Sequence, residues 1–182
     1  MLNNKPLFPK KKGWASFEGD ISTFCKVLLR STPTHEQMNY LLRVQNAGPA
    51  GARIGMSLDA AHEFGVIACA TLYRAFVHGV VSFMFYEHKK DAVAWVERMM
   101  QFVREADPML REQVEVSKLR TFLTANKTHI CHAVGPWSKE TKFGAGLHDV
   151  IILNFDDSPT DKIHKLLDMS KGSIVYVPLQ KK

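Results

Sequence analysis

The sequence lacks a long apolar segment. The longest apolar stretch, residues 66–77, is interrupted by Thr71, Tyr73 and Arg74 and is too short to cross a bilayer. No secretory apolar segment follows Met1. These two absences exclude a transmembrane helix and a cleaved signal peptide. They predict a soluble protein that is not secreted and has no membrane partner.

Cysteine is also scarce, with 3 residues in a chain of 182. Cys25, Cys69 and Cys131 are far apart and odd in number, which excludes a disulfide scaffold. None of them has the close spacing of a zinc ligand pair. We therefore expect reduced thiols that are buried in a core.

A strong charge imbalance is absent as well. The net charge of +6 and the isoelectric point of 9.3 favour a polyanionic partner only weakly. The composition suits one domain over residues 21–182, preceded by a basic extended leader over residues 1–20. Clustered Lys10, Lys11 and Lys12 are typical either of a solvated tail or of an arm that contacts phosphates.

Apolar runs with strand character alternate with helical patterns along the chain. We expect strands at 40–47, 80–86, 150–153 and 173–177, a hairpin within 119–134, and helices at 57–78, 91–106 and 161–169. Strands that alternate with helices of this length predict an α/β fold. We expect a mostly parallel sheet with helices on both faces.

Residues 48–57 form the most informative segment. A phosphate-binding loop reads G-x-x-x-x-G-K-[ST] between a strand and a helix. Gly55 and Ser57 stand where the closing glycine and the Mg²⁺-binding hydroxyl are required, and Met56 stands in the place of the lysine. The spacing therefore favours a nucleotide-binding ancestry, whereas the missing lysine argues against an ordinary ATPase.

The order of these elements resembles the ATPase domain of the large terminase subunits of tailed phages. The lambda-like type has a loop core of arginine, aliphatic residue, glycine, non-lysine and serine, which residues 53–57 match. The resemblance covers roughly residues 33–178. It implies a three-layer P-loop NTPase-like fold, ATP and Mg²⁺ as cofactors, and double-stranded DNA or other phage packaging proteins as partners. It also implies a location in the host cytoplasm or the virion, and a possible oligomer.

The resemblance also implies a set of site residues. The nucleotide is expected to contact Gln37, Gly51, Arg53, Gly55, Met56 and Ser57, with Ser57 and Asp156 at the Mg²⁺ ion. Lys139 and Lys142, together with the three leader lysines, are the expected contacts to nucleic acid. A lone exposed glutamine is the simpler interpretation of Gln37.

The second motif departs from the family pattern. Four apolar residues should be followed by an aspartate that holds Mg²⁺ and a glutamate that orients the attacking water. Asn154 and Phe155 stand there instead. Asp156 and Asp157 follow two positions later, and these expected catalytic carboxylates can replace the missing pair only if the strand end shifts or bulges.

Two catalytic positions are thus altered together, which predicts a domain kept for binding or regulation in phage DNA packaging or genome handling. Whether the protein is an enzyme stays open. One alternative is an atypical active packaging ATPase, whose cation comes from Arg53 or Arg43 and whose acid comes from Asp156 or Asp157; an arginine fork does not reproduce a lysine point charge. Another is an α/β interaction protein that binds no nucleotide and uses its basic arm. The sequence stops about where these motors would still need a coupling segment and a nuclease domain, so we do not expect a complete terminase.

Three residues suggest a metal site at first sight. Regular strand alternation places His129 and Cys131 on one face and His132 on the other, and no second ligand pair accompanies them. We therefore expect a structural role for all three.

Overall fold

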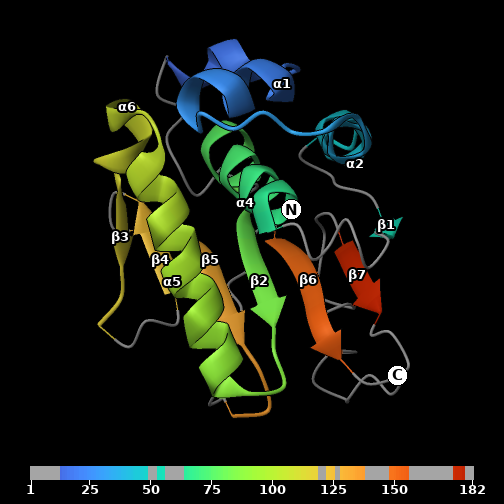
Figure 1. Ribbon diagram of the computed structural model, residues 1–182, viewed down its shortest axis with the longest axis vertical. Helices are drawn as coiled ribbons and strands as arrows, with labels where there is room; N and C mark the ends of the chain where they lie inside the picture. Colours follow the sequence, from blue (N-terminus) through green and yellow to red (C-terminus); the bar gives the residue numbers. More distant parts are fainter. Residues whose placement is uncertain are drawn as a thin grey trace, which may run out of the picture.

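The computed structural model describes residues 13–48, 53–55, 64–118, 122–125, 128–137, 148–155 and 174–178. Within this part of the chain, seven strands form one sheet (Figure 1). They are β1 (Arg53–Gly55), β2 (Val81–Phe85), β3 (Val114–Val116), β4 (Phe122–Ala125), β5 (Thr128–Val134), β6 (His148–Phe155) and β7 (Ile174–Pro178). Their order across the sheet is β1-β7-β6-β2-β5-β4-β3.

The sheet is parallel over most of its width and antiparallel at one edge. β1, β7, β6, β2 and β5 are parallel neighbours, whereas β4 and β3 are antiparallel to the strands beside them. Parallel neighbours need crossover connections, and helices lie in the chain between β1 and β2 and after β2. The expected mostly parallel α/β sheet is therefore confirmed. The hairpin expected within 119–134 is confirmed as β4–β5, and β2 pairs in parallel with β6.

The described helices are η1 (Trp14–Phe17), α1 (Ile21–Thr23), η2 (Phe24–Leu28), α2 (His35–Asn46), α4 (Phe64–Tyr73), η3 (Arg74–His78), α5 (Lys89–Glu105) and α6 (Pro108–Arg111). η2 and η3 continue α1 and α4 in π-helical form. Gly79 ends η3 with a φ of 70°, in the left-handed conformation that favours glycine. The helix expected over 57–78 is thus confirmed from residue 64 onward. None of the helices in the described ranges is long and apolar enough to cross a membrane.

Residues 40–47, expected to be the first strand, instead lie in α2 up to Asn46, so this prediction is wrong. Thr34 starts the helix with a capping box. Its Oγ1 accepts a hydrogen bond from the Gln37 N–H, and the Gln37 Oε1 accepts one from the Thr34 N–H. Leu41 and Val44 lie three residues apart and are both buried, as residues on one helix face are. The apolar run was therefore one face of a helix.

α4 and α5 lie side by side against one face of the sheet, which we call the helix-covered face. The Phe64 ring of α4 lies 5.7 Å from the Trp95 ring of α5 and 6.0 Å from the Phe102 ring, measured between centroids. Met84 of β2 belongs to the same buried cluster. Phe85 is next to it in the strand, points to the opposite face and is also buried, so both faces of β2 are covered.

Two further expectations concern the helix at 161–169 and the leader over residues 1–20. The helix expected over 161–169 lies outside the described residues, so helices on the second face stay a prediction. Residues 13–20, expected to belong to the extended leader, include η1. Trp14 of η1 is buried, with its ring 4.7 Å from that of Phe76.

Candidate functional site

The two segments expected to hold the nucleotide follow the ends of two strands of the same sheet. β1 ends at Gly55 and β6 at Phe155, with β7 between them. Two strand spacings separate β1 from β6 by about 10 Å. Met56 and Ser57 follow β1 directly in the sequence. Ligands of open parallel sheets bind outside the carboxyl ends of the strands, so this edge is the candidate nucleotide site.

β6 is longer than the sequence predicted, and it is irregular near its end. It extends to Phe155, beyond the expected end at residue 153. Between Ile152 and Phe155, three steps along β6 match two steps along β7, so one extra residue is accommodated there. Because β6 ends at Phe155, Asp156 is the first residue after the strand in the sequence. The strand end is thus shifted and irregular, as a replacement of the missing pair would require, and the catalytic role of Asp156 stays a prediction.

The glycine segment does not form one continuous loop. Arg53–Gly55 is β1, which pairs in parallel with β7, and Ile54 is buried. The prediction that residues 48–57 lie between a strand and a helix as a single phosphate loop is therefore wrong over β1. The backbone N–H groups of a strand point to its two sides in turn and do not converge on one anion. Backbone donors for a phosphate would have to come from residues after Gly55.

Other expected site residues lie on different elements. Gln37 is in the first turn of α2, and its Oε1 accepts the Thr34 N–H at 2.7 Å. Arg43 is exposed near the end of the same helix. Arg53 begins β1, two residues before its carboxyl end. The nucleotide contacts expected for Gln37 and Arg53 stay predictions.

Several expected site residues lie outside the described ranges. They are Lys10, Lys11, Lys12, Gly51, Met56, Ser57, Lys139, Lys142, Asp156 and Asp157. In the sequence, Met56 follows directly after β1 and Asp156 directly after β6.

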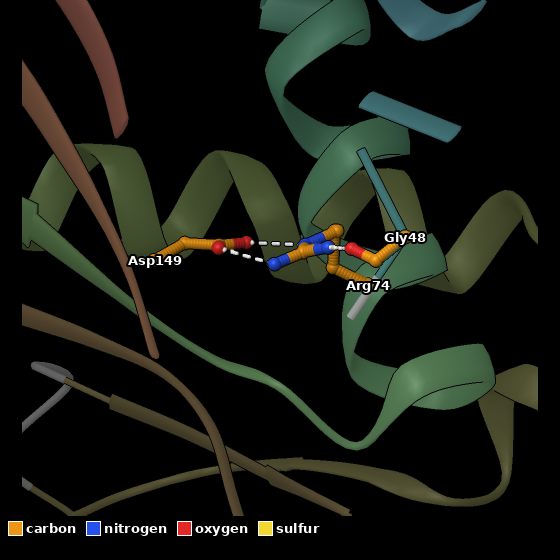
Figure 2. A network of polar contacts seen from close by, with 3 residues as sticks. All are labelled: Gly48, Arg74 and Asp149. Carbon is orange, nitrogen blue, oxygen red and sulfur yellow. Dashed lines mark hydrogen bonds and ion pairs between the residues drawn. The ribbon is translucent and has the colours of Figure 1, made fainter. Parts of the chain in front are cut away.

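A buried ion pair joins α4's continuation, η3, to β6, and the sequence did not reveal it. Arg74 Nε donates to Asp149 Oδ2 at 2.8 Å, and Arg74 Nη2 donates to Asp149 Oδ1 at 2.7 Å. Arg74 is 1% exposed and Asp149 4% exposed. Arg74 Nη1 also donates to the carbonyl oxygen of Gly48 (Figure 2). Such bidentate geometry is the arrangement in which a buried pair offsets its desolvation best.

This ion pair lies at the opposite end of the strands from the candidate nucleotide site. Asp149 is the second residue of β6, and η3 leads through Gly79 into the amino end of β2. Gly48 lies shortly before β1. The only signal in the sequence was an arginine within an apolar helical run. The partner of that arginine could not be identified, because it is 75 residues away.

A bulge in β5 changes the faces on which the histidines lie. Leu123 of β4 is opposite Cys131, but Thr124 is opposite His129, so Ile130 is the extra residue. His129 and His132 therefore share the face opposite the helix-covered one, with ring centroids 5.7 Å apart. The predicted grouping of His129 with Cys131 is wrong, because regular alternation does not survive a bulge.

The surroundings of these histidines are those of a structural pair. Burial is the main cause that lowers the pKa of His132 to about 4, and the neighbouring His129 adds to it. The His132 ring lies 5.9 Å from the Phe83 ring. Among the described residues, no group of three or more histidine, cysteine, aspartate or glutamate side chains is placed to hold a metal ion.

The three thiols are buried, as expected. A hydrogen bond between Cys25 and Cys69 raises the pKa of Cys25, and burial raises it further. Burial alone raises the pKa of Cys131. A thiol with a raised pKa is protonated at neutral pH and inert, so Cys25 and Cys131 are core residues.

Trp137 is fixed at the carboxyl ends of β2 and β5. Its Nε1–H donates to the Tyr86 carbonyl oxygen at 3.1 Å, and its side chain packs against the buried cluster. Gly135 lies beneath this contact, and a Cβ atom there would collide with the Tyr86 oxygen and with Trp137. Trp137 is therefore a structural anchor in this region.

The fold is similar to that of the large terminase of bacteriophage HK97, known from its crystal structure. The two structures superpose with a TM-score of 0.64 at 12% sequence identity. The match covers 92% of this chain and 37% of the HK97 chain, so this chain spans little more than a third of that protein's length. At this identity the similarity shows a terminase-like α/β fold. No protein family model matches the chain, and no curated protein matches it in sequence.

Proposed function

We propose that this chain is a terminase-like domain that acts in phage DNA packaging and binds a nucleotide at the carboxyl ends of β1 and β6 without efficient hydrolysis. The strand order β1-β7-β6-β2, in a fold similar to a large terminase, carries this proposal. In this order, two motif-like segments that are far apart in the sequence follow the carboxyl ends of two strands, β1 and β6, that only β7 separates. This order thereby supports a binding role for the segments that follow Gly55 and Phe155.

The residues after these strands fit a Mg²⁺–nucleotide. Mg²⁺ prefers oxygen ligands, and the Ser57 hydroxyl and the Asp156 carboxylate supply them in the proposed site. The extension of β6 to Phe155 supports Asp156 over the family position, because this residue then comes first after the strand in the sequence. The ion would neutralise phosphate charge there, while backbone N–H groups after Gly55 orient the phosphates.

Met56 is the reason to propose slow hydrolysis. A methionine gives no positive charge to the terminal phosphates, and losing such charge stabilisation costs several kcal/mol, about a thousandfold or more in rate. Phe155 gives no carboxylate to orient a water molecule. A nucleotide-dependent binding or regulatory domain is therefore the proposed role, with double-stranded DNA or a packaging protein as its partner.

Isothermal titration calorimetry with Mg·ATP tests the proposed site. We expect binding by the unmodified chain and at least tenfold weaker binding by Asp156→Ala and by Ser57→Ala, because each removes a Mg²⁺ ligand. Glu105→Ala, an acid removed from the exposed end of α5, is the matched control and should bind as before. Absence of Mg·ATP binding by the unmodified chain contradicts the proposal and favours an interaction protein without nucleotide.

The irregularity of β6 also favours a second candidate function, an atypical active packaging ATPase. In that case Asp156 or Asp157 acts in hydrolysis and Arg53 replaces the lysine. Steady ATP turnover that disappears in Asp156→Ala and in Arg53→Ala supports this function. Turnover at the background rate supports the binding role.

A further inference from the structure

A groove lies at the edge of the sheet formed by β3. It has a volume of about 460 Å³ and is lined by Glu97, Met100, Gln101 and Arg104 of α5 and by Val116 of β3. β3 is the last strand in the sheet order of the described residues, and Val116 is 41% exposed. The groove thus joins an exposed apolar side chain to a strand edge that could accept another strand.

The four residues of α5 are self-complementary. Glu97 lies three residues before Met100, and Arg104 lies three residues after Gln101. If a two-fold axis passes between Met100 and Gln101, two copies of α5 run antiparallel. Glu97 then faces the partner's Arg104, and Arg104 faces the partner's Glu97. One axis therefore forms the same pair of opposite charges twice, as an isologous interface requires.

β3 is self-complementary about the same kind of axis. An axis perpendicular to the sheet pairs a strand antiparallel with its copy and places one residue opposite itself. With Val116 opposite the partner's Val116, Glu115 lies opposite the partner's Ser117, and Val114 lies opposite the partner's Lys118. No like charges meet in this register. Pairing centred on Glu115 would oppose two carboxylates, which is destabilising.

One groove connects the two self-complementary elements. Val116 and the centre of the α5 face line one groove. Val116 is opposite Leu123 on β4, and Leu123 belongs to the cluster beneath α5, so Val116 points to the side of the sheet on which α5 lies. The two valines would therefore fill the groove beneath the two α5 helices. Figure 1 shows α5 and β3 on one flank of the molecule and β1 and β7 on the other.

We propose that this flank binds a second copy of the chain. β3 pairs with the partner's β3 to make one continuous sheet, and α5 lies beside the partner's α5 with two Glu97–Arg104 ion pairs across the axis. The interface lies at the β3 edge of the sheet, whereas the candidate nucleotide site lies near β1, the strand at the other edge of the described sheet. Dimerisation is therefore independent of nucleotide binding.

Sedimentation velocity of the full chain over a range of concentrations tests this dimer. We expect a monomer–dimer equilibrium that Val116→Asp shifts to monomer, because two carboxylates would then meet on the axis. Glu97→Arg alone and Arg104→Glu alone each oppose like charges twice and should weaken dimerisation by about tenfold. The double variant Glu97→Arg/Arg104→Glu exchanges the two charges and should restore it.

Glu105→Arg is the matched control, because it makes the same charge change on α5 outside the groove and should leave the dimer unchanged. Circular dichroism melting shows whether each variant folds. If Val116→Asp does not fold, the restoration by the charge exchange decides alone, since structural damage would not be reversed by a second charge change. A chain that stays monomeric at its highest soluble concentration overturns the proposal, and so does a double variant that fails to dimerise.

Discussion

Arg74 and Asp149 join η3 to β6 at the end of the sheet farthest from the candidate nucleotide site. Arg74 lies in η3, which continues the helix that follows β1, and Asp149 lies near the start of β6. Two hydrogen bonds of 2.7 and 2.8 Å hold the charges together in a buried position. The pair therefore joins η3 to the amino end of β6, and the carboxyl end of β6 leads to the proposed site.

Arg74→Met should lower the free energy of unfolding by about 3–5 kcal/mol, because it leaves the Asp149 carboxylate buried without a partner. Arg74→Met/Asp149→Leu should cost much less than the sum of the single changes, since no charge then remains buried. Urea denaturation measures both. Arg30→Met is the control: the Arg30–Asp107 pair is exposed and 3.9 Å long, and its loss should cost less than about 1 kcal/mol. Equal losses for Arg74→Met and Arg30→Met would refute the role of burial.

Gly135→Ala should destabilise the protein by about 1–3 kcal/mol, because the added Cβ meets the Tyr86 carbonyl oxygen and disturbs its hydrogen bond with Trp137. Gly65→Ala is the matched substitution. Gly65 lies within α4, and a Cβ there has open space, so alanine should stabilise the helix by roughly 0.5–1 kcal/mol. Thermal melting should therefore shift in opposite directions for the two variants, and a shift of the same sign would contradict the prediction.

His132 should make the protein less stable in mild acid. Its pKa of about 4 in the folded state is below the value near 6.5 of an unfolded chain, so the unfolded state binds more protons between these values. The contribution is complete above pH 6.5 and is lost as pH falls toward 4. His132→Phe should reduce the difference in unfolding free energy between pH 7 and pH 5, measured by urea denaturation. The exposed His35→Gln should keep the difference, and a His132→Phe variant that also keeps it would show that another group titrates.

Met56→Lys should create measurable ATP affinity if the segment after β1 binds phosphate. The ammonium would then meet the terminal phosphates, with Ser57 beside it for Mg²⁺. If residue 56 is an ordinary core methionine, a buried lysine should only destabilise the protein. A thermal-shift assay separates the two, because Mg·ATP raises the melting temperature in the first case only. A lower melting temperature that does not respond to Mg·ATP would end the phosphate-binding interpretation of this segment.

Local patterns determined most of the fold. The apolar runs at 80–86 and 150–153 are strands, the stripe over 91–106 is a helix, and the segment 119–134 contains a hairpin. These elements depend on contacts within a few residues, so period and turn residues are sufficient to predict them. The strand prediction for residues 40–47 was wrong because a short apolar run fits a strand or one face of a helix equally well. The capping box at Thr34 marks where α2 begins and does not show how far it continues.

Only the tertiary structure decided where the chemistry-bearing side chains lie. The bulge at Ile130 arises from pairing β5 with β4, and it moved His129 to the face of His132. The irregularity between Ile152 and Phe155 arises from pairing β6 with β7, and the sequence alone did not show that this strand continues to Phe155. The ion pair between Arg74 and Asp149 depends on the packing of η3 beside β6. Alternation and composition are properties of the chain, whereas register and burial are properties of its neighbours in space, which a single sequence does not contain.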